Sequence, residues 1–316
     1  MKNIVRKGVV ALLLLPVMMI SACSGGPGTS TVSQNSGSNS TSKKSASTEE
    51  FTITINENFE GGQTTEQKVP LYGKATKPAT DPVRDGYTFM GWFTETNGAH
   101  FYDFDAEVLS DIDIKAFWRD NSKNQTEYIF EAELAPCITE GAGMSGNTYS
   151  GSTQGKGLIA TPSTPGVKNF KSNNDYWVHF LYATGNTLTM EIEADKADND
   201  AMIFVRLSME YRDNVVLTPE KYPIKLNDVS LDYGTFTFIN VPEQGGGALP
   251  FTDYLLGLSV QLKEGTNKFD FVTANSELHL GTAVATAPMI DCLKIYSTST
   301  LTFPTANMNN LIEDDE

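Results

Sequence analysis

Apolar and polar residues alternate in short segments along most of this chain of 316 residues. This period of two is typical of strands, because successive side chains point to opposite faces of a sheet. Turn-forming Gly, Asn, Asp and Pro separate the segments, and no long window carries the apolar stripe of a helix. The sequence therefore predicts a mainly β chain built from sandwich or barrel domains. The clearest segments are residues 51–55, 188–192, 203–207 and 269–271.

The first 23 residues predict where the protein resides. Basic residues precede an apolar run over residues 9–20, which is too short to cross a membrane and ends in small residues before Cys23. This pattern resembles the lipobox of bacterial lipoproteins. The resemblance implies removal of residues 1–22, lipidation of Cys23 and a lipid anchor at the extracellular face of the bacterial membrane. The alternative is an ordinary cleaved signal followed by a chance cysteine.

Composition separates flexible ends from the folded part. Residues 23–50 are mostly Ser, Gly, Thr and Asn and contain no aromatic residue, so they predict a disordered linker behind the anchor. The last residues, 299–316, end in four consecutive acids and predict a solvated acidic tail. Between them lie about 250 residues, which favours two domains.

Charge and motifs exclude several functions. A net charge of −16 without basic clusters argues against nucleic-acid partners, whereas neutral glycans and cations are compatible with it. The three histidines are scattered, and no nucleophile elbow, phosphate loop or dinucleotide fingerprint is present. We therefore expect a protein that is not an enzyme.

Residues 51–119 form a compact group of motifs. An opening strand is followed by Gly61-Gly62, then Gly86-Tyr87-Thr88-Phe89-Met90-Gly91-Trp92-Phe93, and finally an alternating segment over residues 112–118. These motifs resemble the Listeria–Bacteroides repeat, a β-grasp-like module of bacterial surface proteins. The resemblance implies a spacer or protein-contacting element without catalytic residues. We expect Trp92 and Trp118 to be core residues, because a domain of about 70 residues needs large apolar side chains.

Residues 126–298 carry a second series of motifs. Residues 128–133 read Tyr-Ile-Phe-Glu-Ala-Glu, residues 173–180 hold Asn-Asn-Asp-Tyr-Trp, and residues 288–295 end the series around a single aspartate, Asp291. In this order they resemble the carbohydrate-binding modules of families 6 and 35. The resemblance implies a galactose-binding-like jelly-roll β-sandwich that binds polysaccharide.

Three carboxylates are candidate metal ligands. Glu131 and Glu133 are two apart on an expected strand, so both should project from one face and together chelate a cation. Oxygen ligands suit Ca²⁺. The resemblance implies that both glutamates and Asp291 hold a structural calcium. The alternative is that the glutamates are exposed polar positions on an edge strand.

Sugar binding needs flat apolar rings and polar groups that orient hydroxyls. The resemblance places the sugar at loops at one end of the sandwich. We expect Trp177 to be buried rather than to face a ligand. We expect Phe251 and Tyr254 to lie in a loop. Leu158 departs from the family pattern, where an aromatic is frequent. The candidates are Tyr149, Tyr176, Trp177, Phe251, Tyr254 and Asn275.

Two cysteines remain besides the lipidated one. Cys137 and Cys292 form a disulfide in one interpretation, since the expected calcium would bring their strands together outside the membrane. In the other they stay free, because Cys292 should point away from its neighbour Asp291.

Three functions are compatible with these sequence features. The first is a non-catalytic, membrane-tethered glycan-binding lipoprotein in which the repeat acts as a spacer. The second is a cell-surface adhesin or assembly component that binds protein partners and has lost sugar binding. The third is a subunit that targets a partner hydrolase to its substrate.

Overall fold

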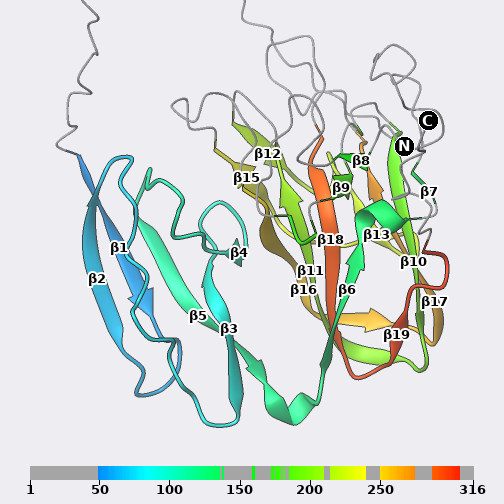
Figure 1. The fold of residues 1–316 in the computed structure, drawn as a ribbon, viewed down its shortest axis with the longest axis horizontal. Coiled ribbons are helices and arrows are strands. Elements are labelled where there is room, and N and C mark those ends of the chain that lie inside the picture. Colours follow the sequence, from blue (N-terminus) through cyan, green and yellow to red (C-terminus); the bar gives the residue numbers. More distant parts are fainter. Residues whose placement is uncertain are drawn as a thin grey trace, which may run out of the picture. The chain divides into compact units, whose positions relative to one another are not determined.

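The computed structural model describes residues 49–135, 137–138, 159–160, 172–174, 176–178, 181, 185–209, 214–239, 250–274 and 287–306. These residues form β-strands in three sheets, with two short 3₁₀ turns, and belong to the compact unit Ser47–Glu316 (Figure 1). The predicted mainly β fold class is confirmed. No helix among the described residues is long and apolar enough to span a membrane.

The repeat module, residues 50–120, is a mixed sheet in the order β2-β1-β5-β3-β4. The central pair β1 and β5 is parallel and the other pairs are antiparallel, which is the β-grasp-like arrangement that the sequence predicts. Gly91 permits close packing of β3, because a Cβ there would lie 2.9 Å from the Phe101 ring. The strands are β1 (Glu50–Asn56), β2 (Thr64–Pro70), β3 (Tyr87–Thr94), β4 (His100–Phe101) and β5 (Ile112–Asp120).

The core of the repeat module contains the predicted tryptophans. Trp92 is 4% exposed and packs with Ile53 and Ile114. Trp118 packs at the edge of this core, and its Nε1 donates a hydrogen bond to the Glu57 carbonyl oxygen over 2.8 Å. Phe89 lies between the two indoles, in edge contact with both. These large rings supply the apolar area that a domain of this size needs.

The sandwich begins at β6 and has two main sheets. The first continues from the repeat module in the order β4-β16-β11-β18-β9-β8, with β6 also on β18; the second runs β14-β13-β17-β10-β19, with β7 also on β10. β12 (Val215–Leu217) and β15 (Phe236–Phe238) form a separate pair. The first sheet has β6 (Thr126–Glu131), β8 (Ile159–Ala160), β9 (Trp177–Val178), β11 (Asp198–Ser208), β16 (Thr252–Leu262) and β18 (Met289–Ser297); the second has β7 (Cys137–Ile138), β10 (Thr187–Ala194), β13 (Ile224–Leu226), β14 (Val229–Ser230), β17 (Gly265–Val272) and β19 (Leu301–Thr302).

Alternation decides which side chains enter the sandwich core. In β10 every second residue, from Leu188 to Ala194, is buried and its neighbours are partly exposed. Phe269 and Phe271 of β17 are fully buried in the same core. β11 differs, because Ile203 and Val205 enter this core while Met202 and Phe204 are buried on the opposite face. A strand buried on both faces must have a second layer over its outer side.

The repeat module supplies that second layer. Phe93, Met202, Phe204 and Tyr296 form a buried cluster, and Phe101 packs against it. The backbone continues the contact, since His100 of β4 pairs with Tyr254 of β16 and the Leu255 N–H donates to the Ala99 carbonyl oxygen. The sequence motifs suggested no such shared face. The repeat module and the sandwich therefore share a sheet and an apolar cluster.

The predicted boundary at residue 298 is too early. β19 lies within the predicted tail and pairs with the end of β10, placing Leu301 opposite Ala194. Phe303 packs on the sandwich core. The sandwich therefore includes the start of the predicted tail, whereas the terminal acids fall outside the described residues.

Candidate carboxylate cluster

A β-bulge in β18 gives the site its form. Cys292 lies opposite Arg206 of β11, but the next pair is Ile290 with Leu207, so Asp291 is an extra residue in β18. Ile290 and Leu293 both enter the sandwich core, while Asp291 and Cys292 do not. A bulge re-aims side chains in this way. The simple alternation that predicts opposite directions for Asp291 and Cys292 is therefore wrong.

Glu131 joins this group across the strand pair. It lies opposite Cys292 in the register of β6 and β18, so the two side chains share the outer face of the sheet. One oxygen of Glu131, one oxygen of Asp291 and the Cys292 sulfur lie within 4.8 Å of one another. Positions 131 and 291 thus lie close together on one face of the sheet.

Glu133 reaches the site by a different route from the predicted one. β6 ends at Glu131, and residues Ala132–Leu134 form a 3₁₀ turn, η2, so the two glutamates do not share a strand. The Glu133 side chain is fully buried rather than exposed on an edge. The edge-strand alternative is therefore wrong for this residue.

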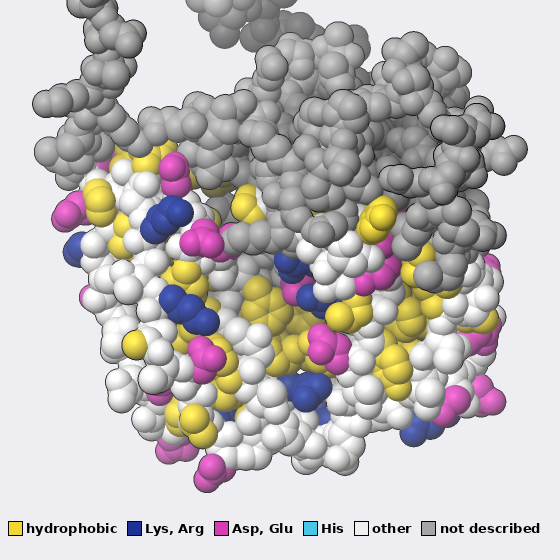
Figure 2. All heavy atoms as spheres, viewed as in Figure 1, with side chains coloured by type: hydrophobic (Ala, Val, Ile, Leu, Met, Phe, Trp, Pro, Cys, Tyr) yellow, Lys and Arg dark blue, Asp and Glu magenta, His cyan; other side chains and the backbone are white. Residues whose placement is uncertain are grey.

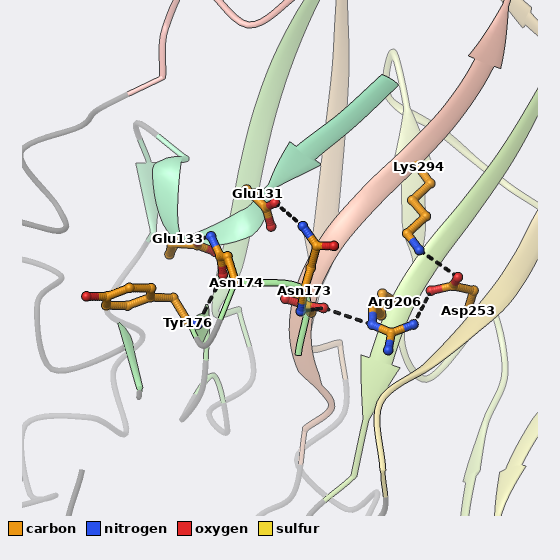
Figure 3. Close-up of polar contacts among 9 residues, drawn as sticks. Glu131, Glu133, Asn173, Asn174, Tyr176, Arg206, Asp253 and Lys294 are labelled. Atoms are coloured by element: carbon orange, nitrogen blue, oxygen red, sulfur yellow. Dashed lines mark hydrogen bonds and ion pairs between the residues drawn. The ribbon is translucent and has the colours of Figure 1, made fainter. Parts of the chain in front are cut away.

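Two asparagines hold the carboxylates in place (Figure 3). Asn173 Nδ2 donates to Glu131 Oε1 over 2.5 Å, and the Asn173 backbone N–H donates to Asp291 Oδ2 over 2.8 Å. Asn174 Nδ2 donates to Glu133 Oε1 over 2.6 Å, and its Oδ1 accepts from the Tyr176 backbone N–H. The segment before β9 is thereby fastened to β6, η2 and β18.

Ion pairs extend the site across the sheet. Arg206 Nε lies 3.0 Å from Asp291 Oδ2, and an Arg206 Nη atom donates to Asp253 Oδ1 over 2.8 Å. Lys294 Nζ completes the row at 2.7 Å from the other oxygen of Asp253 (Figure 3). Strands β18, β11 and β16 therefore carry a continuous row of charged groups.

Burial makes the negative charge in this cluster costly. Desolvation raises the pKa of Asp291 to about 8, although the Asn173 N–H and Arg206 act in the opposite direction. Desolvation also raises the pKa of Glu133 to about 7 and that of Glu131 above its usual range. Glu131 Oε2 and Asp291 Oδ1 are buried with no hydrogen-bond partner among the described residues. The guanidinium that pairs with Asp291 is thus already shared with Asp253, and Glu131 adds further negative charge beside it.

The metal-free protein is expected to lose stability as pH rises from 5 to 8. Asp291 and Glu133 have raised pKa values in the folded chain, so over this range the folded state holds protons that the unfolded state has lost. Stability therefore falls with pH, the reverse of the usual carboxylate case. Thermal denaturation in EDTA at pH 5, 6, 7 and 8 measures this, and Asp291→Asn should flatten the trend. A Tm that rises across the series would contradict it.

The donor set fits a hard cation. The cluster offers carboxylate oxygens, two of them without partners, at a place with too little positive charge to balance them. Ca²⁺ prefers such oxygens, and a divalent charge would compensate the desolvation. The Cys292 sulfur is a poor ligand for calcium, and desolvation raises the pKa of this thiol, which keeps it protonated.

Among the described residues, the predicted sugar-contacting side chains do not gather at an exposed loop. Trp177 is fully buried in β9 and Phe251 packs against it, so both are core residues. Tyr254 lies in β16 rather than in a loop, and is buried against Phe236 and His100. The loop expectation is wrong for Tyr254 because β16 starts at Thr252, whereas Phe251 lies just before the strand.

The other candidates divide into two groups. Tyr176 is half-buried, and its ring points away from the carboxylates (Figure 3). Tyr149, Asn275, Leu158 and Cys23, the residue predicted to be lipidated, lie outside the described residues.

The predicted disulfide is not formed. Cys292 is a buried free thiol on the outer face of the first sheet. Cys137 lies in β7, which pairs with β10 of the second sheet. The two cysteines thus belong to opposite layers of the sandwich.

Sequence reasoning missed the residues that support the carboxylates. Asn173 and Asn174 stand in a motif that marked the following strand, but nothing local links them to positions 131 and 133. Arg206 carried a usable signal, because it is the charged residue inside the apolar segment 203–207. A buried charge of this kind needs a partner. Its partners, Asp253 and Asp291, could be found only from the pairing of β11 with β16 and β18.

Comparison with solved structures gives family 35 carbohydrate-binding modules at low similarity. The chain is similar to such a module from Clostridium thermocellum (16% identity, TM-score 0.34, covering 55% of this chain and 99% of that chain) and to one from Cellvibrio japonicus (13%, 0.31, 58% and 98%). The chain is also similar to a GH26-CBM35 β-(1,4)-mannanase of Podospora anserina (12% identity, TM-score 0.33). That match covers 55% of this chain but only 28% of the enzyme.

The sequence was compared with curated proteins and with models of protein families. The search of curated proteins finds no match. Residues 51–117 match the model of the Listeria-Bacteroides repeat domain, over nearly the same range that the sequence motifs mark. The repeat module of this chain is therefore a Listeria-Bacteroides repeat domain.

Proposed function

We propose that this protein is a non-catalytic glycan-binding lipoprotein, tethered through Cys23 at the extracellular face of the bacterial membrane. The sandwich binds polysaccharide, and Ca²⁺ fixes its carboxylate cluster. The charged start, the short apolar run and the small residues before Cys23 support the proposed tether. Cys23→Ala is expected to release the protein from the membrane fraction.

One observation carries the proposal. The resemblance in the sequence required positions 131, 133 and 291 to share a site, although 158 residues separate the last two. In the structure Glu131 and Asp291 approach each other, and Asn173 and Asn174 link them to Glu133. Chance would not bring these positions together around unpartnered oxygens, so the assembly supports the resemblance and the binding role it implies.

Calcium would be held by Glu131, Glu133 and Asp291. Bound there, the ion supplies positive charge that neutralises the cluster and joins β6, η2 and β18. Asn173 and Asn174 orient the carboxylates from the segment before β9. The role is structural, because the chain's own groups in this cluster are buried and offer no open position for a substrate.

Calcium is expected to raise the Tm of the protein. Binding to the folded state alone contributes about 2.7 kcal/mol at one hundred times Kd, which is roughly 5–10 °C for a chain of this size. Differential scanning fluorimetry in CaCl₂ and in EDTA measures the shift. Asp291→Asn should abolish the response, and the exposed Asp228→Asn should preserve it. Equal Tm values in CaCl₂ and EDTA would refute the calcium site.

The binding function is tested with the mature chain carrying Cys23→Ser, which removes the anchor. The repeat module stays in place, because Phe204 and Tyr296 of the sandwich would otherwise be uncovered. Affinity electrophoresis through galactomannan, xyloglucan, mixed-linkage β-glucan and polygalacturonate should show retardation by at least one polymer. If the folded protein is retarded by no polymer in a broad panel of polysaccharides, the proposal is overturned.

One observation favours a second candidate, a surface protein that binds protein partners. Trp177, Phe251 and Tyr254 are buried, so the described residues present no aromatic pair at the predicted loop site. Retention of a surface protein on the immobilised mature chain, together with no retardation by polysaccharide, would favour this candidate.

A further inference from the structure

A cleft of 820 Å³ lies between the repeat module and the outer face of the first sandwich sheet. Residues of β3 and the segment after β4 line one side, and residues of β6, β16 and β18 line the other. Figure 2 shows a hollow with hydrophobic side chains inside it and both signs of charge around it. Its volume falls in the range of about 300–1,000 Å³ that is typical of small-ligand sites.

Aromatic rings contributed by both parts of the protein line the cleft. Phe89, Tyr102 and Phe104 come from the repeat module, and Tyr296 comes from β18. Tyr102 and Phe104 meet edge to face at 4.9 Å, so their ring planes are fixed at nearly a right angle. The half-buried rings of the repeat module offer flat apolar surface to the C–H faces of a sugar, whereas the Tyr296 ring is largely buried.

Polar groups between these rings are held in place before any ligand arrives. The Tyr296 hydroxyl donates to Glu127 Oε1 over 2.6 Å, and Lys294 is paired with Asp253. The Arg119 guanidinium lies 5.4 Å from the centre of the Tyr296 ring. Hydrogen-bonding groups fixed in this way bind hydroxyls without a further loss of side-chain entropy.

Two polar atoms of the lining residues have no hydrogen-bond partner in the described part of the chain. Trp92 Nε1 and the Tyr102 hydroxyl are buried with no hydrogen-bond partner among the described residues. An unpaired buried donor is unfavourable. Both residues line the cleft, and they are neighbours, because the Tyr102 backbone N–H donates to the Trp92 carbonyl oxygen over 2.7 Å. Burial also raises the pKa of Tyr102 to about 12, so this hydroxyl stays protonated. Tyr102 as a residue is half-buried, so a ligand hydroxyl would supply the missing partner after a small rotation of its side chain.

The charges that line the cleft are balanced. Three cationic side chains face four anionic ones: Lys77, Arg119 and Lys294 against Asp103, Asp105, Glu127 and Asp253. Several are already engaged, since Lys294 pairs with Asp253 and Glu127 accepts from Tyr296. A polyanion would meet no excess of positive charge here. The chemistry fits an uncharged ligand with many hydroxyls and apolar ring faces.

We propose that this cleft binds a segment of a neutral polysaccharide, with the repeat module forming half of the site. The inference rests on the proposed glycan-binding function and gives it a location and a substrate class. The Listeria-Bacteroides repeat then contacts the ligand itself instead of only spacing the sandwich from the membrane.

Filling the cleft tests the proposal. Thr88 is exposed and lines it, so Thr88→Trp occupies the space without removing a core side chain. Val83→Trp is the matched control, because Val83 is an exposed residue of the same module that does not line the cleft. Tyr102→Phe removes only the unpartnered hydroxyl. Tyr176→Ala probes the loop near the carboxylate cluster.

Affinity electrophoresis and calorimetry of the mature Cys23→Ser chain use galactomannan, xyloglucan and mixed-linkage β-glucan, with polygalacturonate as the acidic probe. We expect a neutral polymer to bind, Thr88→Trp to weaken that binding at least tenfold, and Tyr102→Phe to weaken it about fivefold. Val83→Trp and Tyr176→Ala should bind like the parent. Circular dichroism confirms that each variant is folded.

The outcomes separate this inference from the proposed function. Unchanged affinity in both Thr88→Trp and Tyr102→Phe, or loss in Tyr176→Ala alone, overturns the cleft while glycan binding stands. Binding of polygalacturonate alone overturns the neutral ligand and also leaves glycan binding intact. If the parent protein binds no polysaccharide, both the function and the cleft assignment fail.

Discussion

Replacing Arg206 with Met is expected to lower the free energy of unfolding by about 3–5 kcal/mol, because it breaks a buried ion pair from one side. The Arg206 guanidinium contacts both Asp253 and Asp291, and the Asp291 side chain has no exposed surface. Without the guanidinium, Asp291 would be left beside Glu131 with even less positive charge. Urea denaturation in EDTA measures the loss.

A second variant tests whether removing any cationic side chain would have the same effect on stability. Lys268 pairs with Asp270 at 2.8 Å, but its side chain is 41% exposed. Such a pair contributes about 1 kcal/mol or less, so Lys268→Met should be nearly neutral. Calcium should recover part of the stability of Arg206→Met, because it neutralises the same carboxylates. Equal losses in the two variants would contradict the account of the cluster.

Replacing Phe204 with Ala is expected to cost about 3–5 kcal/mol and to uncouple the repeat module from the sandwich. The Phe204 ring is 1% exposed and lies 5.3 Å from Phe101, 5.7 Å from Phe117 and 6.2 Å from Tyr296, centre to centre. The ring therefore packs β11 and β18 of the sandwich against β4 and β5 of the repeat module. The parent should unfold in one transition and the variant in two.

Tryptophan fluorescence reports the two parts separately. Trp92 and Trp118 belong to the repeat module and Trp177 to the sandwich, so Trp→Phe backgrounds assign each transition. Phe271→Ala is the control, since Phe271 is fully buried between the sheets and away from the shared cluster. It should cost a similar amount without splitting the transition. One transition in Phe204→Ala would show that the two parts are held together by other contacts.

Strand alternation predicted the architecture because it depends only on local spacing. The segments 51–55, 188–192, 203–207 and 269–271 all became strands, and the two groups of motifs mark the repeat module and the sandwich. The boundary at 298 was wrong because β19 contains only two residues, too few to show a period.

The site was only partly predictable, because its geometry depends on non-local structure. The resemblance identified the three carboxylates, but the bulge at Asp291 and the turn at Glu133 have no local pattern. Tyr254 looked like a loop residue after three glycines, yet it faces the sandwich core and packs against His100 of the repeat module. The cleft has no signal in the sequence for the same reason, since its walls combine separate segments, the most distant of which hold Thr88 and Tyr296.

The short pairing of β4 with β16 also protects the protein from its own copies. β16 is an eleven-residue strand at the edge of the sandwich sheet, and an uncovered edge of that length is a template for intermolecular strand pairing. His100 and the Ala99 carbonyl group pair with Tyr254 and Leu255, near the start of β16. The rings of Phe93 and Phe101 cover the adjacent face of the sheet. The repeat module therefore covers part of an edge that would otherwise be open to pairing with another copy of the chain.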